Sequence, residues 1–532
     1  MKYKTKNNCC GMYEQEIVDA ILESRRIEDV KRFFNPTEED LLPLTDLKNI
    51  DKAYQVLNKH INNESNIGVL FDTDLDGVTS GTEITRYLLN YVPHINTFIN
   101  NGKSHGLIKQ DLNKYMCLDL LIIVDSLDKD VSQYKALKEN NIDVIVLDHH
   151  TVDENIPYKN YITFVSSNIE YANPQLSGSG VVWKFCKYLD EQYLTNYADE
   201  LVDLAACGIV ADMMDMTVME NRYIVSQGLK QIHNPAIKKI VGSFDFNSTG
   251  ISYSIAPLVN ASNRMDCNES AVNAFLANDN KEVLKYVKEL KKCKEDQNAE
   301  VERLFPSVLE QCEKQKQNKL IYVFIDTQYG IGGLLGNKLL ERYKRPVLVL
   351  KNDGDQYSGS MRAIGINNFM KVCNDSELAE VNGHASAAGI TIKKKKFNEF
   401  IEYIENYLKN IEFTQDELDV DVEIGTADIT KTLVDKIKLI DKVSGEGFKP
   451  CKFLVNDISD FEVSSMSQGK HLVLKSGELL QYIKWNFDGS FETYEDVCLM
   501  GGNVGAVVTL DSGFFGRKFV LKAICDDLWE VG

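Results

Sequence analysis

The sequence predicts an α/β protein built on a parallel sheet, with a second α/β unit joined to it by a long helix and a small β domain at the C-terminus. Three apolar runs in the first 150 residues each end in an aspartate, at Asp72, Asp125 and Asp148. Each run has the length of a buried strand, and helical stretches alternate with them in the βαβ rhythm of a doubly wound sheet. The aspartates would then meet at the carboxyl edge of the sheet, where such folds place their sites.

The other segments follow from the patterning in chain order. Residues 1–60 carry apolar positions at helical spacing and predict a helical lead-in, and residues 61–235 hold the parallel-sheet domain. Residues 236–318 predict a connector with a long helix. Residues 319–410 show a second strand and helix pattern with a glycine-rich loop, and residues 411–532 show short period-two runs typical of an OB-like β-barrel.

Composition narrows the class of protein. The 532 residues are 44% hydrophobic, no window approaches the roughly 18 apolar residues of a membrane span, and the first residues lack the apolar core of a signal peptide. We therefore expect a cytoplasmic protein without a membrane partner. The 12 cysteines include no CxxC pair, which disfavours a zinc knuckle or a disulfide framework and predicts free thiols.

Net charge limits how the chain can bind nucleic acid. A formal charge of -20 disfavours a protein that coats nucleic acid, although it allows a local basic groove. Residues 411–532 contain 12 Lys and Arg against 22 Asp and Glu, a balance of -10. This domain offers Tyr482, Trp485, Phe487 and Phe491 for stacking on bases, but its charge favours packing or docking of a protein partner over strand binding.

Four segments supply a set of metal-binding side chains. Asp72, Asp74 and Asp76 would repel one another unless cations lay between them. The other segments contribute Asp125, then Asp148 with His149 and His150, and finally Asp212. Taken alone, the first run also fits a calcium-type loop or a polar turn, and the two histidines also fit a solvated strand end. Together they favour manganese or magnesium, because carboxylates dominate and no thiolate takes part. Two metals sharing a carboxylate would suit phosphoester hydrolysis.

These segments carry a family resemblance. DTDLDG from Asp72, the Val124-Asp125 pair, DHH from Asp148 and GIVAD ending at Asp212 resemble motifs I to IV of the DHH phosphoesterase superfamily. SGSMR ending at Arg362 and NGH ending at His384 resemble its DHHA1 domain. Further matches narrow the resemblance to the RecJ family of single-strand-specific exonucleases over nearly the whole chain: SGSGVVWKF from Ser177, ENR from Glu220, APLVNASNRM from Ala256 and GEGFKPCKF from Gly445.

The resemblance implies an activity and a role for each matching residue. RecJ-type enzymes digest single-stranded DNA from the 5′ end to mononucleotides, in DNA repair and recombination, with two divalent cations, Mn²⁺ or Mg²⁺. Asp74 and Asp125 would hold one metal, with Asp72 in support. The other would be held by Asp76, Asp125, His149 and Asp212, so Asp125 would bridge. His150 would face the phosphate as a donor. The phosphate-binding residues would be Arg264, Ser360, Arg362 and His384.

Some positions depart from the family pattern. Asn263 and Asn382 stand where the family has glycine. In INNGKSHGLIKQ, where the family carries an arginine and an aromatic residue, Lys103 and His105 are the nearest substitutes for binding a 5′-phosphate. Lysine offers a point charge and not a planar fork, so this contact is expected to differ.

Two alternatives compete with the exonuclease. A phosphodiesterase of short oligonucleotides or cyclic dinucleotides would typically lack the C-terminal domain, and a replication scaffold would have lost metal ligands. The chain has both the domain and the ligands. The expected partners are single-stranded DNA and, at the acidic C-terminal domain, a single-strand-binding protein, a helicase or another docking protein. The amino-acid composition does not distinguish a bacterial origin from a phage origin.

Overall fold

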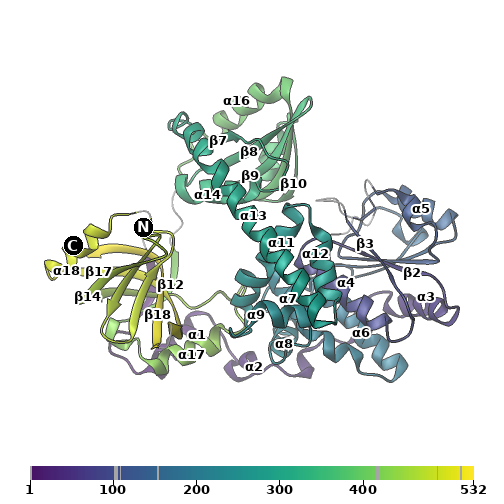
Figure 1. Cartoon of the computed structure of the whole chain (residues 1–532), viewed down its shortest axis with the longest axis horizontal. Helices are drawn as coiled ribbons and strands as arrows, with labels where there is room; N and C mark the ends of the chain where they lie inside the picture. Colours follow the sequence, from purple (N-terminus) through teal and green to yellow (C-terminus); the bar gives the residue numbers. More distant parts are fainter. Residues whose placement is uncertain are drawn as a thin grey trace. The chain divides into compact units, whose positions relative to one another are not determined.

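The computed structural model describes residues 3–100, 106–107, 110–151, 155–413, 418–487, 489–515 and 518–531. The chain divides into two compact units (Figure 1): Met1–Ala256 with Glu417–Gly532 form the first, and Pro257–Asp416 form the second. Among the described residues, no helix is both long enough and apolar enough to cross a membrane.

A five-stranded parallel sheet lies at the centre of the first unit. Its strand order is β3-β2-β4-β5-β6, with neighbours β2 and β4 buried at every position. A sheet covered on both faces needs such continuous apolar strands. Helix α5 lies on one face, while α3, α4 and α6 lie on the other (Figure 1). The bounds are β2 Ile67–Phe71, β3 Asn96–Ile99, β4 Leu120–Val124, β5 Asp143–Asp148, β6 Thr163–Ser166, α3 Ile50–Asn62, α4 Leu75–Leu88, α5 Val131–Glu139 and α6 Gly178–Tyr193.

Shorter helices complete this part of the unit. Helix α7 is the most apolar of them and is buried along nearly its whole length, because small residues let it pack closely on α4 and α6. The bounds are α1 Glu14–Ser24, α2 Val30–Phe34, α7 Val202–Ala211, α8 Met219–Gly228, α9 Pro235–Val241 and α10 Ser248–Gly250.

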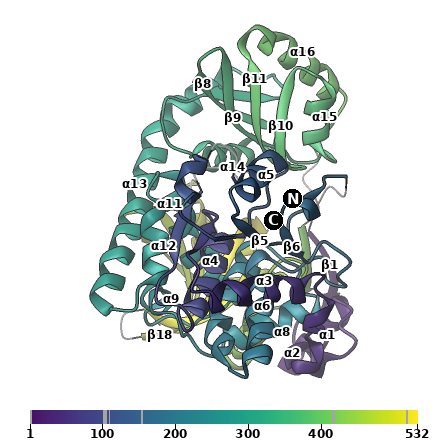
Figure 2. The same ribbon diagram turned by 90° about the vertical axis from the view of Figure 1, so that its right-hand side faces the viewer.

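The second unit is a mixed sheet between two pairs of helices. Its strand order is β10-β11-β9-β8-β7, and only β7 and β8 are parallel. Helices α15 and α16 pack on one face and α13 and α14 on the other (Figure 2). The expected long helix is α13, Asn280–Glu313. The other bounds are α11 Ala256–Arg264, α12 Asn268–Leu276, β7 Ile321–Phe324, α14 Gly332–Tyr343, β8 Val347–Asp353, β9 Gln356–Arg362, α15 Phe369–Asp375, β10 Ala379–His384, β11 Ala387–Lys393 and α16 Phe397–Leu408.

One disulfide in this unit is an exception to the expectation of free thiols. Cys267 and Cys293 are bonded, and the other ten cysteines are free. The packing of α12 against α13 brings the two residues together. Their separation of 26 positions in the sequence gave no sign of this.

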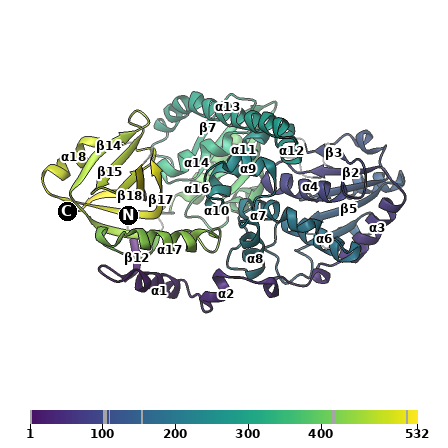
Figure 3. The same cartoon turned by 60° about the horizontal axis from the view of Figure 1, so that its bottom comes forward.

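An eight-stranded sheet forms the C-terminal part of the first unit, with α17 and α1 beside it (Figure 3). Its order is β1-β12-β13-β17-β18-β16-β15-β14. No pairing joins β1 to β14 among the described residues, so a closed OB-like barrel is not confirmed. The bounds are β12 Leu418–Glu423, α17 Lys431–Asp441, β13 Phe453–Ile458, β14 Phe461–Met466, β15 His471–Ser476, β16 Leu480–Lys484, α18 Phe491–Leu499, β17 Asn503–Phe515 and β18 Lys518–Val531.

The N-terminal strand of this sheet corrects the prediction of a wholly helical lead-in. Strand β1, Tyr3–Asn8, pairs in parallel with β12. Its sequence YKTKNN is polar and has no apolar period, so only the distant partner reveals it as a strand.

Candidate metal centre

The turn between β2 and α4 presents three carboxylates. Asp72 follows the strand, Asp74 caps the helix by accepting a hydrogen bond from Gly77 N at 3.0 Å, and Asp76 lies in the first turn. A Cβ at Gly77 would lie 2.5 Å from Asp72 Cβ, so glycine is needed for the helix to start this close to the strand end. The start of a helix also favours negative charge nearby.

Helix α6 begins against the same carboxylates. The backbone amides of Gly178 and Ser179 donate to the two carboxylate oxygens of Asp76, at 2.8 and 3.0 Å. A Cβ at Gly178 would lie 2.7 Å from Asp125 Oδ1, and one at Gly208 of α7 would lie 2.1 Å from Asp76 Oδ1. The glycines of the SGSG and GIVAD segments therefore give these two helices room to pack on the carboxylates.

Asp125 lies between the other acidic groups. It follows β4, has a left-handed backbone with φ of 52°, and is 2% exposed. Burial and the charge of Asp76 raise its pKa well above the usual value. Its Oδ1 receives no hydrogen bond from the described residues, and the His149 ring lies beside it, with Nε2 at 3.2 Å.

His149 connects the acids from different elements. Its Nε2 lies 3.4 Å from Asp212 Oδ2, at the C-terminus of α7, and 3.8 Å from Asp76 Oδ2. Ligand atoms of Asp76, His149 and Asp212 form one group within 4.8 Å, and those of Asp72, Asp74 and Asp125 form another. The structure thus brings all the sequence-predicted metal ligands into two adjoining groups.

Asp148 has a role that the sequence did not reveal. It is fully buried and accepts hydrogen bonds from Leu127 N, His149 N and His150 N, and from the His150 Nδ1 position at 2.7 Å. The charge of Asp148 raises the pKa of His150 to about 10 against the opposing effect of burial. The contact with Asp148 therefore favours the protonated form of His150.

Mutual repulsion marks this edge of the sheet as a cation site. Burial, together with the charges of Asp72 and Asp76, raises the pKa of Asp74 to about 7. Carboxylate oxygens with one imidazole form a ligand set that suits Mn²⁺ or Mg²⁺. The buried Asp125 Oδ1, which accepts no hydrogen bond from the described residues and lies among these ligand atoms, fits a bound cation.

In the second unit, basic and hydroxyl side chains meet at the glycine-rich turn before α14. A Cβ at Gly333 would lie 2.4 Å from Arg362 Nη2, one at Gly332 would lie 3.3 Å from Ser360 Oγ, and one at Gly330 would lie 3.5 Å from Arg264 Cα. Burial and the charge of Arg362 lower the pKa of Arg264.

Neither guanidinium of this turn forms an ion pair with a described carboxylate. Arg362 donates to Asn337 Oδ1 and Met361 O, both at 2.7 Å, and Arg264 approaches Gln297 Oε1 at 3.5 Å. Two neighbouring guanidiniums whose hydrogen-bond acceptors among the described residues are neutral oxygens favour an anion such as phosphate.

Known proteins resemble both of these regions. Residues 66–209 match the N-terminal domain of the DHH family, and residues 317–410 match the DHHA1 domain. The putative prophage-derived single-strand DNA-specific exonuclease YorK of Bacillus subtilis is 30% identical over 529 residues, covering 90% of each chain. This chain belongs to the RecJ family.

Other RecJ proteins agree with this assignment. The RecJ exonuclease of Bacillus subtilis is 26% identical over 436 residues, which cover 78% of this chain and 55% of that protein. Among solved structures, RecJ of Thermus thermophilus in complex with Mn²⁺ superimposes with a TM-score of 0.80 at 20% identity, covering 100% of this chain and 80% of that one. This likeness supports the fold.

Two departures of this RecJ-family chain from the family pattern lie in regular secondary structure, and three predicted phosphate-binding residues stay predictions. Asn263 lies within helix α11 and Asn382 pairs with Gly389 in the β10–β11 ladder, so neither residue has a left-handed backbone that would require glycine. Lys103 and His105 lie outside the described residues. His384 ends β10 and is exposed, and no described hydrogen bond or ion pair joins it to the arginines.

Buried polar residues behind the acidic edge were also missed. Asn100 donates to Asp72 Oδ1 at 3.1 Å and to Ser126 Oγ at 2.8 Å, and Ser126 Oγ accepts from Gly106 N at 2.6 Å. These hydrogen bonds hold the Asp72 carboxylate in place. A signal existed in the sequence, since Asn100 follows β3 and Ser126 follows Asp125 at the same sheet edge.

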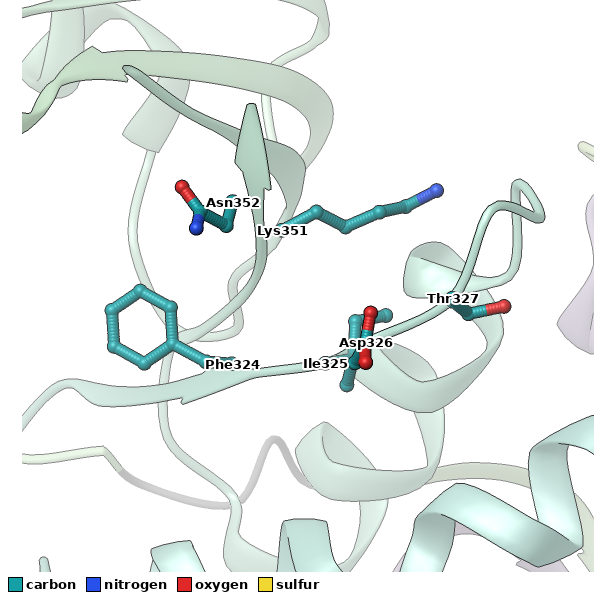
Figure 4. Close-up of a pocket in the computed structure, with 6 residues that line it drawn as sticks. All are labelled: Phe324, Ile325, Asp326, Thr327, Lys351 and Asn352. Atoms are coloured by element: carbon teal, nitrogen blue, oxygen red, sulfur yellow. The ribbon is translucent and has the colours of Figure 1, made fainter. Parts of the chain in front are cut away.

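A pocket of about 410 Å³ lies elsewhere in the second unit, at the ends of β7 and β8 (Figure 4). Its lining includes Phe324, Asp326, Lys351 and Asn352. Lys351 Nζ donates to the backbone oxygens of Gln328 and Tyr329, so it shapes the glycine-rich turn. None of the predicted site residues lines this pocket.

Proposed function

We propose that this chain is an exonuclease that hydrolyses single-stranded DNA from the 5′ end to mononucleotides, with two divalent cations, in DNA repair or recombination. The observation that carries the proposal is the pair of adjoining ligand groups around Asp125, in a chain 30% identical to a putative single-strand DNA-specific exonuclease. Mn²⁺ is the preferred cation, because imidazole joins the carboxylates at one position, and Mg²⁺ is the alternative.

The two groups divide the cations between them. Asp72, Asp74 and Asp125 would hold one, and Asp76, Asp125, His149 and Asp212 would hold the other. When bound, two such cations lower the pKa of a bound water and neutralise charge on the reacting phosphate. The three glycines at positions 77, 178 and 208 support this site by letting backbone and helices approach the carboxylates.

The remaining residues would bind and orient the phosphodiester. Protonated His150, held by Asp148, donates a hydrogen bond to a phosphate oxygen and stabilises the negative charge that grows there during attack by water. Arg264, Ser360 and Arg362 bind phosphate groups of the strand, and His384, Lys103 and His105 remain proposed contacts of the same kind. The water oxygen would form the new bond to phosphorus as the bond from phosphorus to the ester oxygen breaks, and the one proton that the water loses balances the one that the leaving oxygen gains.

The C-terminal sheet is proposed to be OB-like but secondary in strand binding. Of its four candidate aromatics, Tyr482 is fully buried and its hydroxyl is paired with Thr426, and Phe487 packs on Phe491 and Tyr494. Together with the acidic balance, this supports a docking surface for a protein such as a single-strand-binding protein or a helicase.

A long single strand with a radioactive 5′-phosphate tests the direction and the substrate. We expect labelled mononucleotide as the first product with Mn²⁺, no product with EDTA, and little cleavage of duplex DNA. The matched control is the D125N protein. A ladder of shortened labelled strands would instead show attack from the 3′ end, and cleavage restricted to oligonucleotides of a few residues would identify a short-oligonucleotide phosphodiesterase.

A further inference from the structure

The loop from Asp212 to Met216 is anchored unequally at its two ends. Asp212 caps α7, and the next residue, Met213, has a left-handed backbone with φ of 57° and is 65% exposed. At the other end, Met216 is fully buried. The position of the Asp212 carboxylate therefore depends on the helix before it and on whatever holds Met216.

A segment more than two hundred residues later holds that end. Residues Val443–Phe448, called here the docking segment, run beside the loop: Met216 N donates to Glu446 O at 2.8 Å, and Asp215 forms a parallel β-bridge with Glu446. The segment fits because of its glycines. A Cβ at Gly447 would lie 2.0 Å from Asp215 Oδ1, and one at Gly445 would lie 2.7 Å from Met216 Cγ.

A buried arginine ties the loop and the docking segment together. Arg222 is 1% exposed, and its Nη1 donates to Met216 O at 3.4 Å and to Val443 O at 3.1 Å. Its guanidinium lies 3.6 Å from the ring centre of Phe33 and 4.9 Å from that of Phe448. A buried cation must keep its acceptors, so this contact resists sliding of the segment against the loop.

We propose that the docking segment is a positioning element for Asp212. By fixing Met216 and Asp215, it keeps the Asp212 carboxylate beside His149 and Asp76, and so makes the C-terminal part of the chain a determinant of metal affinity. The inference rests on the proposed role of Asp212 as a ligand. Metal ligands tolerate errors of only about 0.2 Å, and supporting contacts typically change affinity by about 10- to 100-fold.

The chain offers a matched pair of glycines for the test. Gly447 and Gly477 both have left-handed backbones, with φ of 72° and 62°, but a Cβ at Gly477 meets nothing within 4 Å. Mn²⁺ binding to each full-length variant is titrated by the electron paramagnetic resonance signal of free Mn²⁺, and metal-free unfolding is measured beside it. We expect Gly447→Ala to weaken one of the two Mn²⁺ sites by about tenfold and Gly477→Ala to leave both unchanged.

Two further variants keep the test decisive if Gly447→Ala folds poorly. Gly445→Ala meets the flexible Met216 side chain, so a smaller loss of Mn²⁺ affinity in the same direction is expected. Replacing Asp215 by alanine removes the atoms that a Cβ at position 447 would meet. The double variant Gly447→Ala/Asp215→Ala should therefore bind Mn²⁺ as Asp215→Ala alone does, a rescue that general destabilisation would not produce.

Asp212→Ala separates failure of this inference from failure of the proposed site. If Asp212→Ala weakens Mn²⁺ binding while Gly447→Ala and Gly445→Ala both bind like Gly477→Ala, the positioning role is overturned and the metal site stands. If Asp212→Ala itself binds two Mn²⁺ ions as tightly as the unchanged chain, the ligand role of Asp212 fails and the positioning role falls with it.

Discussion

Each compact unit contains a corner where a strand ends, glycine follows and a helix begins, but the two corners gather opposite charges. At the β2–α4 corner, Gly77 lets the helix start against Asp72, and carboxylates collect there. At the β7–α14 corner, Gly333 leaves room for the Arg362 guanidinium, and a second arginine lies nearby. The same backbone feature, a glycine at the turn from strand to helix, occurs in both units. The charge of the side chain that packs against the glycine decides whether the corner suits cations or phosphate.

The largest effect should come from removing charge at the acidic corner. Asp125→Asn keeps the shape of a side chain that tolerates φ of 52°, whereas alanine there would add backbone strain to the loss of the ligand. We expect hydrolysis of single-stranded DNA to fall by more than about a hundredfold, or about 2.7 kcal/mol, because both cations lose a shared ligand.

The same substitution should not unfold the protein. Asp125 is repelled by neighbouring carboxylates, so the metal-free Asp125→Asn chain should melt at or above the temperature of the unchanged chain. Hydrolysis above about a tenth of the original rate would contradict the bridging role.

Substitutions at the basic corner should have a smaller effect, and they should change KM instead of metal binding. Arg362→Ala is expected to raise KM for a single strand by about tenfold, and Arg362→Lys by about threefold, since lysine keeps the charge but loses the planar fork. Mn²⁺ titration should be unchanged in both variants, which separates phosphate binding from metal binding. Equal strand affinity in all three proteins would remove Arg362 from the phosphate site.

The sequence predicts these corners only where the residues that form them carry a local pattern. Contacts between residues that are far apart in the sequence could not be predicted. The acidic edge follows from buried strands that end in aspartate, so the gathering of Asp72, Asp125 and His149 could be predicted from the sequence. The role of Asp148 could not, because only the geometry shows its oxygens facing backbone amides and His150. Strand β1 and the docking segment also escaped prediction, because their partners lie hundreds of residues away and their own sequences carry no periodic signal.

A change of pH should alter the stability that the acidic corner contributes, but not the stability that the basic corner contributes. In the metal-free protein the pKa of Asp74 is raised to about 7, so folding favours the protonated carboxyl. The contribution of Asp74 to stability should therefore fall as pH rises from about 4 to about 7 and then level off. We expect the metal-free chain to melt about 5 °C lower at pH 8 than at pH 5.5, with a smaller difference in Asp74→Asn or with Mn²⁺ present. Scanning calorimetry checks this, and Arg362→Lys, at the corner without such a group, should keep the full pH dependence.

The smallest effect is expected at the C-terminal sheet. Trp485 is 46% exposed and packs edge-on against His471, which makes it the best remaining candidate for stacking on a base, since Tyr482 is buried. A stacked base typically contributes about 1 to 3 kcal/mol, so loss of such a contact would weaken binding by at least about fivefold. The sheet is acidic and lacks a second aromatic of equal exposure near Trp485 in β15 and β16, so we expect Trp485→Ala to change affinity for long single strands by less than about threefold.

Fluorescence anisotropy with strands of increasing length measures this affinity, with Arg362→Ala measured beside Trp485→Ala. If the loss at Trp485 grows with strand length and reaches that of Arg362→Ala, the C-terminal sheet binds the strand directly, and the contrast between acidic and basic regions does not extend to it.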